Sequence, residues 1–143
     1  MARPSIKYRA GYKYQLHDSY SIALPWISGH PDCQEELLSV SGATLTILPG
    51  YAWDGASGPT VDSPSSMRGS LVHDALYQLM RMGVLPESCR PAADKVFYRL
   101  CIEDGMDRFR AWVWYWAVRL FAASAARRGT DRPVLSAPGG GLG

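Results

Sequence analysis

Hydrophobic and polar residues alternate along the N-terminal part of the chain. Between Ile6 and Leu16 every second residue is apolar or aromatic, and most of the residues between them are basic or polar. A period of two is typical of a β-strand with one buried face. After the turn-forming residues His17-Asp18-Ser19, the segment Tyr20–Leu24 predicts a second short strand, which Pro25 ends or places at a sheet edge.

A second pair of short apolar segments follows a loop predicted over Ser28–Glu36. Leu38–Val40 and Ala43–Leu48 predict a β-hairpin, with Ser41-Gly42 as its two-residue turn. The residues expected to face the core are Val40, Leu45 and Ile47. The first fifty residues therefore favour an antiparallel sheet.

The hydrophobic spacing then changes to three or four residues, which is typical of amphipathic helices. The predicted helices cover about 66–82, 90–103 and 107–127. Ser65 or Ser66 is the expected N-cap of the first helix, and Gly83 and Gly105 follow the ends of the first and second. The long segment 51–66, rich in Gly, Ser and Pro, is predicted to be a loop that lies over the first helix.

This order of elements predicts an α+β fold, with an N-terminal antiparallel β-sheet followed by a three-helix unit. We expect one domain over residues 1–126, in which 1–50 form the sheet, 51–66 the loop and 66–126 the helices. Residues 127–143 are dominated by Gly, Pro and Ser and predict a flexible tail.

Composition places few limits on function. The chain has 143 residues, of which 47% are hydrophobic and 20% charged, as in an ordinary soluble globular domain. A net charge of +2 gives no indication of nucleic-acid binding. Three cysteines without a C-x-x-C pair, and no apolar leader, predict reduced thiols and no signal peptide. The oligomeric state is left open.

The third predicted helix is apolar on all sides over residues 111–118. Such a helix is usually buried in a core. The alternative is contact with a membrane surface, because Trp112, Trp114 and Trp116 are accompanied by arginines. The segment is too short, and too interrupted by Arg119, to be a transmembrane helix.

The candidate chemistry lies in the first two helices. His73 and Tyr77 are four residues apart and share a helix face. If the two helices pack antiparallel across their short connection, Asp94 of the second helix lies alongside His73. A carboxylate on one ring nitrogen fixes the imidazole tautomer, and the other nitrogen can then deprotonate a water molecule.

A cation site is also conceivable beside this pair. Asp74 is rotated by about 100° from His73 on the helix and would face the preceding loop. That loop runs from Asp54 past Gly55 to Ser57 and can supply backbone carbonyl oxygens, and Asp54 and Asp62 can supply carboxylate oxygens. A hard cation such as Ca²⁺ prefers ligands of this kind.

The same residues also fit a purely structural role. A His in the middle of a helix with a nearby Asp is often a buried polar pair that fixes helix packing. Asp94 can equally be a first-turn carboxylate favoured by the helix dipole. Spacing alone therefore leaves catalysis and helix bracing both open.

Four motifs carry a family resemblance, which covers roughly residues 43–121. They are Leu48-Pro-Gly-Tyr-Ala-Trp-Asp-Gly-Ala-Ser57, Arg68-Gly-Ser-Leu-Val-His-Asp-Ala-Leu-Tyr77, Ala93-Asp94, and Arg110-Ala-Trp112 with Tyr115 and Ala117-Val-Arg119. Together they resemble a family of small phage and prophage proteins of unknown function. The resemblance implies a bacteriophage or prophage origin, a place in the host cytoplasm or the virion, and other phage structural proteins as possible partners. Trp53 and Ser57 belong to its first motif.

A second resemblance concerns the site alone. His73-Asp74 with Tyr77, followed by Asp94 on the next helix, is similar to secreted phospholipase A2, which has H-D-x-x-Y on one helix and a downstream Asp on its partner. That resemblance implies His73 as base, Asp94 as its orienting residue and Asp74 as a calcium ligand. The disulfides of those enzymes have no counterpart here, the loop before the first helix is longer and has two prolines, and a strand-rich N-terminal half is foreign to their fold.

Two functions follow as hypotheses. The first is a phage-encoded, metal-assisted hydrolase that acts on a component of the cell envelope. The second is a non-enzymatic virion or tail component, or an assembly factor, in which His73, Asp74 and Asp94 brace the helices.

Overall fold

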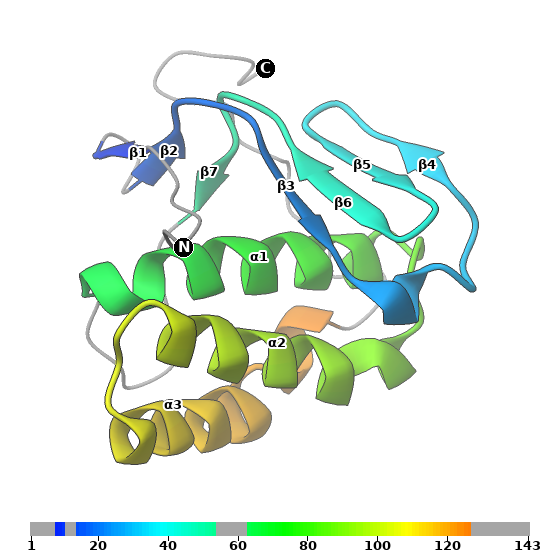
Figure 1. The fold of residues 1–143 in the computed structure, drawn as a ribbon. Coiled ribbons are helices and arrows are strands. Elements are labelled where there is room, and N and C mark those ends of the chain that lie inside the picture. The colour runs from blue at the N-terminus through cyan, green and yellow to red at the C-terminus, as the bar shows by residue number, and fades with distance from the viewer. Residues whose placement is uncertain (1–7, 11–13, 54–62, 127–143) are drawn as a thin grey trace. The chain divides into compact units, whose positions relative to one another are not determined.

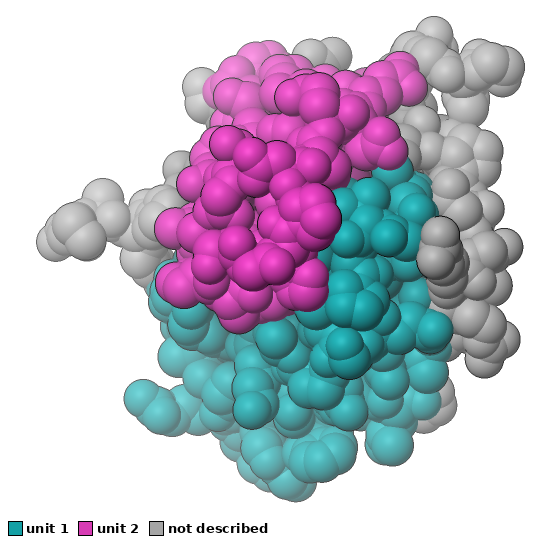
Figure 2. Space-filling view, turned by 90° about the vertical axis from the view of Figure 1, so that its right-hand side faces the viewer, with its two compact units in different colours: residues 1–5, 55–131 teal, residues 6–54, 132–143 magenta. Residues whose placement is uncertain are grey.

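The computed structural model describes residues 8–10, 14–53 and 63–126, and Figure 1 shows its fold. The chain divides into two compact units, which Figure 2 colours separately. The sheet unit lies within residues 6–54, and the helical unit lies within residues 55–131. Antiparallel strands followed by three α-helices confirm the predicted α+β fold class. A single domain over residues 1–126 stays a prediction.

The first sheet of the sheet unit has three antiparallel strands in the order β1-β2-β7. They are β1 (Tyr8–Ala10), β2 (Tyr14–Leu16) and β7 (Ala52–Trp53). Tyr8 pairs with Leu16, so the chain reverses between β1 and β2. The prediction of one continuous strand here is wrong, because both arms of a hairpin alternate just as one long strand does. Strand β7 lies where the sequence predicts loop.

The second sheet has the order β3-β6-β5-β4 and is also antiparallel. Its strands are β3 (Tyr20–Ala23), β4 (Cys33–Gln34), β5 (Leu38–Ser41) and β6 (Thr44–Ile47), and the short 3₁₀ helix η1 (Pro25–Ile27) follows β3. The predicted hairpin is confirmed, and its core residues Val40, Leu45 and Ile47 are buried. Ser41 pairs with Thr44, so the turn is Gly42-Ala43, one residue later than predicted. Gly42 has a φ of 59°, which glycine tolerates best.

The helical unit contains α1 (Pro64–Arg81), α2 (Arg90–Glu103) and α3 (Arg108–Phe121), with 3₁₀ helices η2 (Glu87–Cys89) and η3 (Ala123–Ala126). Helix α1 starts earlier than predicted because Ser63, not Ser65 or Ser66, is its N-cap, and Pro64 fits the first helical position. The Ser63 N–H donates to Oγ of Ser66 at 3.0 Å. Helix α3 ends earlier than predicted, and η3 follows it.

Only one side of α3 is buried. Ala111, Trp114 and Val118 are buried, whereas Trp112 and Trp116 are 52% and 44% exposed. The prediction of a helix buried all round is therefore wrong, because an all-apolar segment hides which of its faces has a partner.

Helices α1 and α2 pack closely, and a glycine makes this possible. A Cβ atom built on Gly69 would lie 3.2 Å from both Cys101 Sγ and Phe97 Cδ1, and 3.3 Å from the Phe97 carbonyl oxygen. Further along α1, the ring of His73 lies 5.3 Å from that of Phe97. Later residues of α1 thus meet earlier residues of α2, so the two helices are antiparallel. This arrangement brings His73 alongside the first turns of α2.

Candidate functional site

The predicted contact between His73 and Asp94 is confirmed. Nε2 of His73 lies 2.6 Å from Oδ1 of Asp94, a short hydrogen bond between α1 and α2. Asp94 is completely buried, and the His73 side chain is 7% exposed. The contact follows from the antiparallel packing of the two helices across the short connection that contains Gly83, whose φ is 78°.

Tyr77 completes this group one turn further along α1. Its hydroxyl donates to the same Asp94 oxygen at 2.6 Å, and its ring centroid lies 4.2 Å from that of His73. His73 and Tyr77 share a helix face, as their spacing predicts, and both donate to one carboxylate oxygen. Each donor restricts the rotation of Asp94, so its orientation toward the imidazole is fixed.

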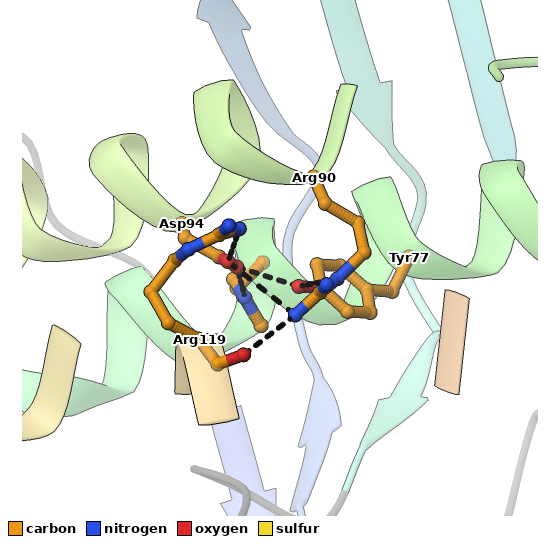
Figure 3. A network of polar contacts seen from close by, with 5 residues as sticks. Tyr77, Arg90, Asp94 and Arg119 are labelled. Carbon is orange, nitrogen blue, oxygen red and sulfur yellow. Dashed lines mark hydrogen bonds and ion pairs between the residues drawn. The ribbon is translucent and has the colours of Figure 1, made fainter. Parts of the chain in front are cut away.

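Two arginines lie against the second carboxylate oxygen of Asp94 (Figure 3). Arg119 of α3 donates from Nη1 to Oδ2 of Asp94 at 2.9 Å, and Nη2 of Arg90 lies 3.9 Å from the same oxygen. Arg90 also donates to the Tyr77 hydroxyl at 3.1 Å and to the Arg119 carbonyl at 3.0 Å. The network of His73, Tyr77, Arg90, Asp94 and Arg119 thus joins all three α-helices.

The predicted site residues did not include Arg90 or Arg119, although Arg119 belongs to the last of the family motifs. Arg90 precedes Asp94 by four residues in α2, a spacing that places an ion pair on one helix face. Arg119 is a charged residue directly after the apolar segment 111–118, which indicates a partner close by. Its partner lies 25 residues away in the sequence, so only the fold identifies it.

The network keeps Asp94 ionised. Burial alone raises the pKa of this carboxyl, but the hydrogen bonds and charges of His73, Tyr77 and Arg119 outweigh burial and hold it below its usual value of 3.8. Burial and the neighbouring Asp94 raise the pKa of the Tyr77 hydroxyl well above its ordinary value, so it remains a donor. The hydrogen bond to Asp94 likewise raises the pKa of Arg119.

The ionised carboxylate determines the tautomer of His73. Asp94 can only accept, so Nε2 must carry the ring hydrogen, and a neutral ring then has its lone pair on Nδ1. Nδ1 makes no hydrogen bond with any residue that the structure describes. The His73 side chain as a whole keeps 7% exposure. Chemically, such an imidazole can accept a proton at Nδ1.

Of the other predicted site residues, the structure describes Asp74 and Trp53 only. Asp74 is half-buried on α1 and has an interaction of its own, while Asp54, Gly55 and Ser57 lie outside the described residues. Trp53 belongs to β7 in the sheet unit, where its ring centroid lies 5.6 Å from that of Tyr14. Within the described ranges, no group of three His, Cys, Asp or Glu residues is arranged to hold a metal ion. The calcium site stays a prediction.

Fold and network together define a small α+β protein whose helical unit is tied together by a buried His–Tyr–Asp–Arg network. The chain belongs to the family described as "Protein of unknown function (DUF1353)", whose model matches residues 36–118. The match includes His73, Tyr77, Arg90 and Asp94 and stops one residue before Arg119. It confirms the resemblance to a family of unknown function, whereas phage origin and similarity to phospholipase A2 stay predictions. No curated protein matches the chain, and no solved structure does.

Proposed function

We propose that this protein is a hydrolase in which His73 acts as general base toward a water molecule. The observation that supports the proposal is the unequal use of the two ring nitrogens. Nε2 is fixed by an ionised carboxylate at 2.6 Å, whereas Nδ1 has no hydrogen bond within the described residues. A histidine that only braces two helices is expected to have both nitrogens in hydrogen bonds, because an unpaired buried nitrogen costs free energy.

The proposed reaction is the hydrolysis of an acyl ester. Nδ1 of His73 removes a proton from water while the water oxygen forms a bond to the acyl carbon, and the carbonyl electron pair moves onto its oxygen. The tetrahedral intermediate then collapses, the bond to the leaving oxygen breaks, and the imidazolium returns the proton to that oxygen. Asp94 stabilises the imidazolium between these two steps through the 2.6 Å contact with Nε2.

Arg119 and Tyr77 have supporting roles in this mechanism. Because Arg119 holds Oδ2 of Asp94 at 2.9 Å, the carboxylate stays ionised and does not take the Nε2 proton. Tyr77 donates to Oδ1 and its ring lies against the imidazole at 4.2 Å between centroids, so the imidazole keeps one orientation. Both are positioning residues, since neither is proposed to contact the reacting atoms.

Asp74, together with Asp54 and the Gly55 carbonyl, would hold a divalent cation such as Ca²⁺. A bound cation supplies charge that stabilises the carbonyl oxygen of an ester as it becomes negative. The resemblance to small phage and prophage proteins supports a phage-encoded enzyme, and the resemblance to phospholipase A2 supports a cell-envelope lipid as its target. Both are analogies of motif, and the His73 geometry does not depend on either.

The test compares His73→Gln with a matched substitution, His17→Gln. His17 is an exposed histidine paired with an aspartate, Asp18, in the sheet unit. Fatty-acid release is measured on anionic phospholipid vesicles with Ca²⁺, and ester cleavage on a soluble p-nitrophenyl ester. His73→Gln should lower both rates by about a hundredfold to ten-thousandfold with the fold intact by circular dichroism, while His17→Gln changes neither. Equal rates in His73→Gln and wild type would refute the proposal.

A second candidate is a non-enzymatic virion or tail component, or an assembly factor. The observation that favours it is the burial of the group: counted over the whole residue, Asp94 is 0% exposed, His73 is 5% exposed and Tyr77 is 2% exposed. In this case the network serves to fix the packing of α1, α2 and α3. The same experiment separates the two, because His73→Gln would then lower the midpoint of thermal unfolding and no hydrolysis by the wild type would be detected.

A further inference from the structure

The exposed face of α3 carries large hydrophobic side chains. Phe109 and Leu120 are 71% and 69% exposed, and Trp112, Val113 and Trp116 are 43% to 52% exposed. Their spacing of three or four residues places them along one side of the helix. Phe109 and Trp112 stack on each other at 6.2 Å between ring centroids, so the two rings form a continuous apolar surface. We call these five residues the α3 stripe.

This stripe differs from ordinary exposed apolar residues in its continuity. Single exposed hydrophobic side chains need no explanation, but contiguous patches usually mark an interaction site. Among the described residues, all the large hydrophobic side chains that are strongly exposed belong to the α3 stripe. The buried side of α3, with Trp114 stacked on Phe97 of α2, faces the helical unit, so the stripe faces away from α2. A partner that covers it is therefore expected.

The charges that border the stripe favour one partner. Helix α3 contains three arginines and no acidic residue. At 100° per residue, Arg108 and Arg119 lie on one side of the stripe and Arg110 lies on the other. Arg108 and Arg110 are exposed, and Arg110 stacks on Trp114 with its Cζ atom 5.1 Å from the ring centroid. The carboxylate of Asp107 caps the helix by accepting from the Arg110 N–H.

We propose that the α3 stripe is a docking surface for an anionic phospholipid bilayer. Two tryptophans and a phenylalanine suit the interfacial region, and arginines on both sides suit lipid phosphates. The fourteen residues of α3 span about 21 Å, so the helix can lie in the plane of the interface along its whole length. Within the described residues, no helix is long and apolar enough to cross a membrane, which agrees with a surface position. The proposal does not rest on the hydrolase.

The test measures partitioning of the full-length protein onto vesicles by flotation. One set of vesicles contains phosphatidylglycerol and phosphatidylethanolamine, the other only phosphatidylcholine. We expect binding to the anionic vesicles that weakens as salt is raised, and little binding to phosphatidylcholine. The double variant Trp112→Ser with Trp116→Ser should bind the anionic vesicles about a hundredfold more weakly. Both side chains are exposed, so circular dichroism should show an unchanged fold.

Matched substitutions lie outside the stripe. Trp26→Ser removes a half-buried tryptophan of the sheet unit, and Lys95→Ala removes an exposed cation of α2. Neither should change binding, whereas Arg108→Ala should weaken it severalfold. Three results would overturn the proposal: no binding to anionic vesicles, equal binding by the double tryptophan variant, or a wild-type dimer in light scattering that the double variant abolishes while vesicles stay unbound. The last result would assign the stripe to a second copy of the chain.

Discussion

Replacing Asp94 by Asn tests the central ionic group of the helical unit. Asp94 accepts three hydrogen bonds, from His73 at 2.6 Å, from Tyr77 at 2.6 Å and from Arg119 at 2.9 Å. Asn has almost the same shape, and its oxygen can still accept from His73 and Tyr77. Its amide nitrogen then faces Nη1 of Arg119, so two donors oppose each other and the guanidinium loses its counter-charge.

The expected loss of stability follows from this geometry. Removing one partner of a buried ion pair typically costs 3–5 kcal/mol. Two of the three hydrogen bonds survive, and the Arg119 side chain keeps 25% exposure, so we expect the lower end, about 3 kcal/mol in the free energy of unfolding. For a chain of 143 residues this corresponds to a fall of about 10 °C in the unfolding midpoint.

The pH dependence gives a second measurement on the same variant. Burial opposes ionisation of Asp94, but its partners lower the pKa below 3.8, so the folded state binds a proton less readily than the unfolded state. The stabilisation is therefore complete above the unfolded pKa and is lost as the pH falls through the folded value. The stability difference between wild type and Asp94→Asn should accordingly shrink as the pH drops below about 4.

The assay is urea unfolding followed by far-ultraviolet circular dichroism, which reports on the helices, at neutral and at acid pH. Asp18→Asn is the matched control, because Asp18 is an exposed carboxylate beside a histidine in the sheet unit. That substitution should change stability by less than about 0.5 kcal/mol. If Asp94→Asn cost less than about 1 kcal/mol at neutral pH, or if its cost did not decline in acid, the buried carboxylate would not be the ionic centre inferred from the structure.

Three further predictions concern the helical unit and the thiols. Tyr77→Phe keeps the ring stacked on His73 but removes the donor to Asp94 and the acceptor of the Arg90 N–H, and should cost about 1–2 kcal/mol in urea unfolding. Arg68→Met removes a 3% exposed guanidinium that binds Glu103 and Asp104, and should cost about 3 kcal/mol in the same assay. Burial raises the pKa of the Cys101 thiol and excludes solvent, so an aromatic disulfide reagent at mildly alkaline pH should label half-buried Cys33 in the native protein and Cys101 only on unfolding.

Sequence patterns predicted the contact between His73 and Asp94, but not the arginine that joins it from α3. The His73–Asp94 contact follows from helical periodicity and a short connection, which together determine the antiparallel packing. Arg119 joins the network from a third helix, and no local pattern shows which face of that helix meets Asp94. The metal ligands predicted in the loop before α1 remain predictions, because Asp54, Gly55 and Asp62 lie outside the described residues.

For the strands and for α3, the sequence likewise predicted the type of element but not where a strand reverses or which helix face is buried. Alternation identified strand character correctly in the first fifty residues, but it carries no information on where a strand reverses, so β1 and β2 were merged. The two-residue strands β4 and β7 are too short to show a period at all. In α3 the apolar residues surround the whole helix, and the sequence alone does not separate buried Trp114 from exposed Trp112. Tertiary packing decides where a strand reverses and which tryptophan is buried, because the same side chains can occupy a buried or an exposed position.

Helix α3 takes part in both proposals, through Arg119 at one edge of the α3 stripe and through the stripe itself. Arg119 binds Asp94 at 2.9 Å, and the α3 stripe is exposed. Trp112 and Trp116 are not among the residues that bind Asp94, so replacing both should leave ester cleavage in solution unchanged while vesicle binding is lost. His73→Gln should have the opposite effects, because its ring lies between α1 and α2, away from the stripe. If the tryptophan variant lost activity on the soluble ester, the two surfaces of α3 would be coupled, and vesicle binding could then control the position of Asp94.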